Sequence, residues 1–371
     1  MQIKALQKNV LTALLLLSLS TSIATAQSLD GWYKVFTGPI GNFTATLHLH
    51  KSAKNYSGYI WFLQHQWPMQ LYYNTPSIQT DSLVISAGSG PMSIVLSGVL
   101  NNDSFNGICE ISKDNGTAKQ ASFELRASID DTYTPFNYYY TEGFAKLSPQ
   151  FNNHSECSYI ASSIWPVNNN KTDEVYKNEI RQMFDIKTPV AEIGGWLIDE
   201  KNRYVSVWKK ENGKLSPKEA ADLGLSLTLQ EEVRVLVMYE NEKHITIAQY
   251  NAGYTGGAHG SFATSLTTFN KQTGKKLKLS DVVNAAGIQL LPMVLDQVAR
   301  QQYNIKNNKP LDQNGFLVRK ISPNQNFYLT GDGIGFMYAP YAIKSFADGE
   351  INLLVPFATL KAYLLPGIVA K

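Results

Sequence analysis

The sequence is poor in cysteine. Its 371 residues include 2 cysteines, Cys109 and Cys157. A scaffold held together by several disulfides is therefore excluded, as are zinc sites built from repeated Cys-x-x-Cys pairs. Two alternatives stay open: the two thiols form one disulfide, or each is part of a hydrophobic core. Cys109 shares a predicted strand face with Phe105 and Ile111, which fits the second.

Long hydrophobic runs occur only at the N-terminus. Residues 1–26 combine Lys4 and Lys8, a leucine-rich segment and a small-residue Ala-Thr-Ala site, which is the pattern of a secretory signal peptide. No later stretch approaches the roughly 18 apolar residues of a membrane-spanning helix, and no cysteine follows the cleavage site to carry a lipid. We expect a periplasmic or secreted protein with no transmembrane segment in the mature chain.

Motifs of the common enzyme classes are missing. The chain has no H-E-x-x-H, no Cys-x-x-Cys and no phosphate-binding G-x-x-x-x-G-K-[ST] sequence. Ser261 follows His259 by two residues, but it lacks the G-x-S-x-G setting of an activated serine. Asp332 and Asp348 precede glycines, where turns favour aspartate. We therefore predict no catalytic residue, no metal site and no cofactor, so the sequence favours a non-enzymatic protein.

Charge is sparse and unevenly distributed. Charged residues make up 17% of the chain, for a net charge of +3. Residues 261–371 hold 12 basic and 6 acidic side chains, whereas acidic residues are in excess from 27 to 260. This basic segment either attracts an anionic partner such as a cell-wall polymer or is a solvated lysine-rich surface. Export and the lack of an arginine-aromatic cluster argue against nucleic acid.

The segment 27–130 predicts strands only. In "NFTATLHLH" strict alternation places Leu47 and Leu49 on one face, with His48 and His50 on the other. Seven further strand-like runs are separated by turn signals, so we predict an antiparallel all-β barrel or sandwich. The two histidines either share a metal or face solvent; because no third ligand is near, we predict that they face solvent.

The rest of the chain predicts an α+β module in two subdomains, 157–260 and 261–371, after a linker over 131–156. Strands and helices mix there without strict alternation. One helix is predicted to begin at a Thr172 or Asp173 cap, and another at Ser216, with Pro217 in its first turn. A hairpin is predicted to turn on Gly331-Asp332-Gly333.

Two C-terminal sequences carry a family resemblance. These are "YTGGAHGSFATSLTTFNKQTGKKLKLSDVV" and, after a predicted helix, "FYLTGDGIGFMYAPYAIKSFADGEINLLVPFATLKAYL". They resemble the exported lysozyme-binding domain family of the anti-sigma factor RsiV, which also occurs beside peptidoglycan deacetylase domains. The stretch from about Ser158 is similar to the companion subdomain that precedes that domain. The resemblance covers roughly residues 157–365.

The resemblance implies a structural role for the glycine-rich element. We expect Gly256, Gly257 and Gly260 to need a positive φ or a close approach between strands. His259 is expected to make structural hydrogen bonds inside that turn, and the alternative is that it acts as a catalytic base.

The resemblance implies that the function is binding. The family domain grips lysozyme and covers its active-site cleft, so Pro340, Tyr341 and Phe346 are the expected contact residues, unless they only pack their loop. We therefore expect an exported, non-enzymatic envelope protein that recognises a lysozyme-like muramidase or the peptidoglycan glycan. The alternatives are a cell-wall hydrolase or esterase using His259, and a structural protein of envelope assembly. The chain has neither a cytoplasmic sigma-binding segment nor the deacetylase motifs.

Overall fold

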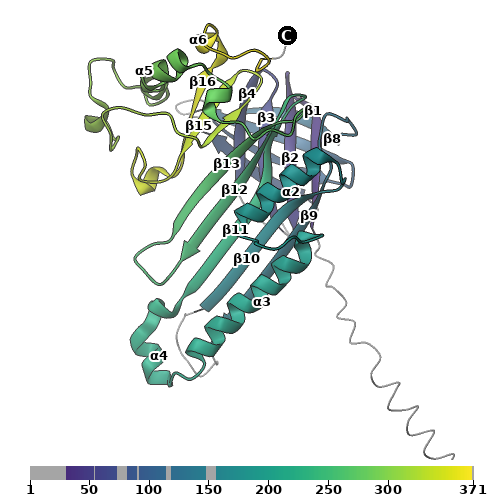
Figure 1. Cartoon of the computed structure of the whole chain (residues 1–371), viewed down its shortest axis with the longest axis vertical. Helices are drawn as coiled ribbons and strands as arrows, with labels where there is room; N and C mark the ends of the chain where they lie inside the picture. The colour runs from purple at the N-terminus through teal and green to yellow at the C-terminus, as the bar shows by residue number, and fades with distance from the viewer. Residues whose placement is uncertain are drawn as a thin grey trace, which may run out of the picture.

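The computed structural model describes residues 31–53, 55–72, 82–89, 92–113, 118–147 and 156–369. It contains an N-terminal barrel, a five-stranded sheet and a three-stranded sheet with associated helices (Figure 1). The prediction of an antiparallel β-barrel followed by an α+β module is confirmed. The predicted signal peptide lies outside the described residues. Among those that are described, no helix is both long and apolar enough to cross a membrane.

The barrel closes through eight antiparallel strands, with β1 pairing with both β2 and β8. Its interior is filled by apolar side chains such as Leu47, Leu49 and Phe105. Gly98 and Gly107 face each other on β6 and β7, and a Cβ on either would lie within about 2.1 Å of backbone atoms of the other strand. The barrel therefore bends where two strands approach without side chains. Its strands are β1 (Gly31–Ile40), β2 (Phe43–Ser52), β3 (Asn55–Phe62), β4 (His65–Tyr72), β5 (Ser82–Ser89), β6 (Met92–Leu100), β7 (Ser104–Lys113) and β8 (Lys119–Ala127).

The five-stranded sheet has the order β13-β12-β11-β10-β9, and only β10 and β11 are parallel. Strand β9 lies inside the stretch 131–156 that the sequence predicts as a linker, so that prediction is wrong there. Its tyrosines alternate between the two faces of an edge strand that pairs with β10 along its full length. The sheet also runs across the predicted boundary at residue 260, because β13 pairs with β12. Its strands are β9 (Phe136–Lys146), β10 (Glu156–Pro166), β11 (Leu229–Glu240), β12 (His244–Tyr254) and β13 (Ser261–Asn270).

Three helices connect β10 to β11. Helix α2 (Lys171–Met183) is capped two residues before Thr172, the earlier of the two expected caps, because Asn170 accepts a hydrogen bond from the backbone N–H of Asp173. Helix α4 (Pro217–Leu223) has the predicted capping box between Ser216 and Glu219. The long helix α3 (Ile193–Asn212) was not predicted; it starts at Glu192 without a side-chain cap and carries two glycines in its first turn.

The C-terminal part builds a second core around a three-stranded antiparallel sheet, β14-β15-β16. The predicted hairpin joins β14 (Phe327–Leu329) to β15 (Gly333–Tyr338), and β16 (Ile351–Pro356) completes the sheet. Helix α5 (Ala285–Gln302) packs Leu291 and Leu295 into this core. Short elements complete the fold: α6 (Phe357–Leu360) and the 3₁₀ helices η1 (Gly224–Leu227), η2 (Leu279–Asp281), η3 (Leu311–Gln313) and η4 (Phe346–Asp348).

The barrel and the five-stranded sheet meet across a buried, partly polar interface. Both His48 and His50 are fully buried there, so the prediction that they face solvent is wrong. His48 Nδ1 is hydrogen-bonded to the Tyr33 hydroxyl at 2.7 Å. His50 Nε2 accepts from the Val237 backbone N–H at 3.3 Å, next to the bulge of β11. The predicted alternation of side chains along β2 is confirmed, but the face that carries the histidines packs against another sheet and not against water.

A buried ion pair extends this interface. Lys271 and Glu240 lie 2.7 Å apart, and Glu240 also accepts hydrogen bonds from the backbone and hydroxyl of Thr134. Burial raises the pKa of the Glu240 carboxyl although Lys271 opposes the shift. The pair links the β13 end to the segment between barrel and sheet.

The two cysteines belong to different cores. Cys109 is buried inside the barrel, and Cys157 is buried between β10 and Trp208 of α3. Both thiols are free, so the disulfide alternative is wrong.

The buried histidines make stability depend on pH. Burial lowers the pKa of His48 from 6.5 to about 3 and also lowers that of His50. Below about pH 6.5 the unfolded chain binds protons that the folded protein does not, so the free energy of unfolding falls as pH decreases toward 3. We expect the variant His48→Gln, which cannot titrate, to lose less stability, by up to about 1.4 kcal/mol per pH unit.

Urea unfolding between pH 7 and pH 4 measures this difference. The variant His259→Gln, at an exposed position, is the matched control and should follow the parent protein. Parallel curves for the parent and His48→Gln would contradict the assignment.

Candidate functional site

The five-stranded sheet has one face that is only partly covered. Helices α2 and α3 cover the other face; for example, Tyr159 contacts Tyr204 of α3 at a ring distance of 5.1 Å. The barrel covers this face at the C-terminal end of β11 (Figure 1). There the ring centroids of Trp61 of β3 and Tyr239 of β11 lie 4.9 Å apart. Beyond that contact the face is open and forms a trough of about 530 Å³.

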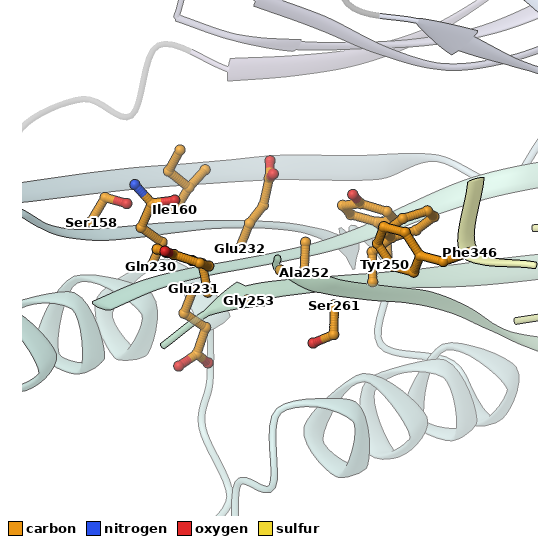
Figure 2. Close-up of a pocket in the computed structure, with 13 residues that line it drawn as sticks. Ser158, Ile160, Gln230, Glu231, Glu232, Tyr250, Ala252, Gly253, Ser261 and Phe346 are labelled. Atoms are coloured by element: carbon orange, nitrogen blue, oxygen red, sulfur yellow. The ribbon is translucent and has the colours of Figure 1, made fainter. Parts of the chain in front are cut away.

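The trough runs across four neighbouring strands. Figure 2 shows Glu232 and Tyr250 projecting from the sheet on one side, whereas Glu231 and Ser261 project from the opposite side. Small residues, Ala252 and Gly253, lie between them. The lining residues come from β10, β11, β12, β13 and the loop before β16, and are Ser158, Ile160, Gln230, Glu231, Glu232, Tyr250, Ala252, Gly253, Tyr254, Gly260, Ser261, Phe262 and Phe346.

The two sides of the trough differ in chemistry. Its β12–β13 side is aromatic, with Tyr250 6.4 Å from Phe262 and Phe262 5.5 Å from Phe346 between ring centroids. Its β10–β11 side is polar: Gln230 donates to Glu156 at 3.2 Å, and Glu232 forms an ion pair with Arg234. Burial raises the pKa of the Tyr250 phenol, and Glu232 adds to the shift, so this hydroxyl is protonated at neutral pH.

An aromatic patch next to the trough brings together the predicted glycine-rich turn and the predicted contact loop. His259 from the glycine-rich turn lies 4.4 Å from Phe346 and 6.4 Å from Tyr341, and the latter two rings are 5.6 Å apart. We call His259, Tyr341 and Phe346 the aromatic patch. Tyr341 is 56% exposed, whereas Phe346 and the neighbouring Pro340 are partly buried. The patch thus has an exposed ring on a half-buried base.

The buried side chain of Lys344 anchors the loop that carries Tyr341 and Phe346. The Lys344 ammonium lies 4.7 Å and 4.9 Å from the ring centres of Tyr303 and Phe316, and 3.1 Å from the Asp348 carboxylate. Cation–π contacts of this kind are strongest where the cation is desolvated, as this buried side chain is. The loop is therefore anchored in the C-terminal core.

Tyr341 has an unusual backbone conformation. Its φ is +67°, in the left-handed region that non-glycine residues rarely adopt. Such conformations cost of the order of 1–3 kcal/mol and are concentrated at functional sites. The fold keeps this strain and presents the ring to solvent.

The glycine-rich turn is only partly explained by backbone requirements. Gly256 has φ +81°, and a Cβ there would lie 2.5 Å from the Ser226 Cα. A Cβ on Gly260 would lie 2.9 Å from the Gly253 carbonyl oxygen. Gly257 has open space around it and no positive φ, so the expectation of a backbone constraint is wrong for that residue.

His259 makes a local hydrogen bond in this turn. Its Nδ1–H donates to the Gly260 carbonyl at 2.7 Å. Ser261 begins β13 with its side chain on the opposite face of the sheet from Phe346 (Figure 2). The arrangement does not form the serine–histidine hydrogen bond that nucleophilic catalysis requires.

Side chains of the C-terminal part occupy the outer edge of β13. Glu350 accepts from the Thr264 backbone N–H at 2.5 Å and from its hydroxyl at 2.7 Å. Asn326 accepts from the Leu266 N–H at 2.6 Å and donates to the Thr264 carbonyl at 2.8 Å. Burial raises the pKa of the Glu350 carboxyl. These bonds fix the position of the patch relative to the sheet.

Four residues of the trough and its surroundings were not predicted from the sequence: Glu232, Tyr250, Phe262 and Glu350. Glu350 belongs to the quoted "FADGE" sequence, where a carboxylate after a turn could have been noticed. Tyr250, Phe262 and Glu232 lie on strands whose alternation marks a second face, but sequence alone does not show that this face is left open.

One known family matches the C-terminal part of the chain. A family model described as "Protein of unknown function (DUF3298)" matches residues 274–358. That range contains α5, the three-stranded sheet and the loop with Tyr341 and Phe346. No curated relative matches the chain.

Two solved structures are similar in fold. A DUF3298 family member from Bacteroides fragilis NCTC 9343 aligns with a TM-score of 0.54 and 22% identity, over 62% of this chain and 94% of its own. A DUF3298 family protein from Pseudomonas aeruginosa PAO1 aligns with a TM-score of 0.47 and 12% identity, over 65% and 99%. At 22% identity, the likeness to the Bacteroides protein establishes a common fold.

The geometry of the turn predicts unequal effects of two neighbouring substitutions. Gly256→Ala should lower the free energy of unfolding by about 1–3 kcal/mol, because it combines a left-handed backbone with a clash. Gly257→Ala is the matched control and should change it by less than about 0.5 kcal/mol. Denaturant titration measures both values, and equal effects would show that the turn is not constrained as described.

Proposed function

We propose that this protein is an exported, non-enzymatic binding protein of the bacterial cell envelope that docks a lysozyme-like muramidase through the aromatic patch. One observation carries the proposal: Tyr341 is exposed in a strained conformation and lies against Phe346 and His259. Exposure of a large ring costs free energy that burial against a partner recovers, and strained backbone conformations are concentrated at functional sites. The class of partner comes from the resemblance to the RsiV-type lysozyme-binding domains, and the DUF3298 model covers the loop that carries the patch.

The patch has the composition of a protein-binding hot spot. Aromatic side chains bury a large area with few rotatable bonds, and tyrosine is enriched among residues that dominate binding energy. Lys344 holds the loop before any partner arrives, so little conformational entropy is lost on association. A pre-organised aromatic loop fits insertion into a cleft.

The charge near the patch is compatible with a basic partner. The segment 261–371 is basic as a whole, which would slow the approach of a basic lysozyme. Next to the patch, however, Lys344 is paired with Asp348, and Glu350 lies at the edge of β13. The local environment of the patch is therefore not dominated by the excess lysines.

We expect Tyr341→Asn to weaken muramidase binding by about 1–3 kcal/mol, as hot-spot truncations do. Asparagine tolerates the left-handed backbone, so thermal stability should not fall. Isothermal titration calorimetry of protein lacking residues 1–26 against chicken-type and goose-type lysozymes measures the affinity. Ile129→Asn removes a 99% exposed apolar side chain from another site and serves as the control. Lack of binding to any lysozyme class, or equal affinities for both variants, would reject the proposal.

A further inference from the structure

We propose that the trough is a second binding site, which takes an uncharged pyranose oligosaccharide. The trough and the aromatic patch share Phe346, but most of the trough lies on the sheet, away from Tyr341 and His259. The inference goes beyond the muramidase proposal and does not depend on it.

The arrangement of side chains matches the two surfaces of a sugar ring. A pyranose has apolar C–H faces and a rim of hydroxyl groups. Tyr250, Phe262 and Phe346 form a row along one side of the trough, with neighbouring ring centres 5.5–6.4 Å apart, and such rings pack on apolar faces. Planar amide and carboxylate groups, from Gln230 and Glu232, lie on the other side, where hydroxyls need donors and acceptors.

The floor leaves room for a ligand of several rings. On this face of β12, Ala252 presents only a methyl group, and the neighbouring Gly253 has no side chain (Figure 2). The volume of about 530 Å³ lies in the range of small-molecule sites, roughly 300–1,000 Å³.

Charge argues for a ligand without negative groups. The carboxylate that projects into the trough is that of Glu232, and, among the described residues, the lining contains no lysine or arginine. The nearby Arg234 is already paired with Glu232. An anionic polymer would therefore meet no free cation in the lining and would lie beside the Glu232 carboxylate, whereas neutral hydroxyls can donate to that carboxylate.

Calorimetry with three tetrasaccharides tests the site on protein lacking residues 1–26. We expect the N-acetylglucosamine tetramer, cellotetraose or both to bind with a Kd below about 1 mM, that is, more tightly than about −4 kcal/mol. Tetragalacturonate, which carries a carboxylate on each ring, should bind at least about tenfold more weakly. Lack of binding by both neutral sugars, or preference for tetragalacturonate, would overturn the proposal.

Variants locate the site on the sheet. Tyr250→Leu should weaken binding of the neutral sugar by about tenfold through loss of ring packing, and Glu232→Gln by about fivefold through loss of a charged acceptor. Glu231→Gln is the matched control, because its side chain points to the other face of the same strand (Figure 2). It should leave affinity unchanged. If Glu231→Gln and Glu232→Gln behave alike in folded protein, the trough is not the site.

The two proposals fail separately. Tyr341→Asn should weaken lysozyme docking but leave sugar affinity unchanged, because Tyr341 does not line the trough. Sugar binding without lysozyme binding would support the trough proposal and reject the muramidase proposal. Lysozyme binding without sugar binding would support the muramidase proposal and reject the trough proposal.

Discussion

A β-sheet has two faces, and the five-stranded sheet of this protein is covered by helices on one of them and only partly covered on the other. Helices between β10 and β11 pack on the first face. The second is covered by the outer wall of the barrel, which reaches only its near end. The trough, the polar interface around His48 and His50, and the position of the aromatic patch all follow from this unequal cover.

The polar interface has a different physical character from the cores on either side of it. Apolar side chains fill the barrel and the C-terminal sheet, and such packing tolerates exchange of one hydrophobic residue for another of similar volume. The contact of barrel with sheet includes a directed bond from the Val237 backbone N–H to His50. Beside it lie a buried His48–Tyr33 bond within the barrel and the Lys271–Glu240 ion pair on the sheet side. The bond to His50 favours one orientation of barrel and sheet, because a buried polar group that loses its partner is costly.

Local patterns in the sequence were sufficient to predict most of the elements. Alternation found the barrel strands, and the Ser216–Pro217–Glu219 sequence found the start of α4, because these signals lie within a few neighbouring residues. Helix α3 was missed since its start lacks a side-chain cap, and β9 since its tyrosines were interpreted as a linker. The buried state of His48 and His50 depends on a strand nearly 190 residues away, which alternation within β2 cannot reveal.

The site was predictable in its pieces but not in its assembly. The resemblance pointed to Tyr341, Phe346 and the turn around His259, and the structure brings all three together. No local signal indicates that Lys344 anchors the loop, because its partners Tyr303 and Phe316 come from other elements. The trough is equally invisible from sequence, since it is defined by where the barrel stops.

The occupied edge of β13 has a consequence for the protein's behaviour at high concentration. A free strand edge offers a row of donors and acceptors on which another chain can pair, and this is a common start of aggregation. Here Glu350 and Asn326 already use the backbone groups of Thr264 and Leu266. The sheet is thus terminated by the protein's own side chains, and lateral polymerisation through this part of β13 is blocked without a proline or a bulge.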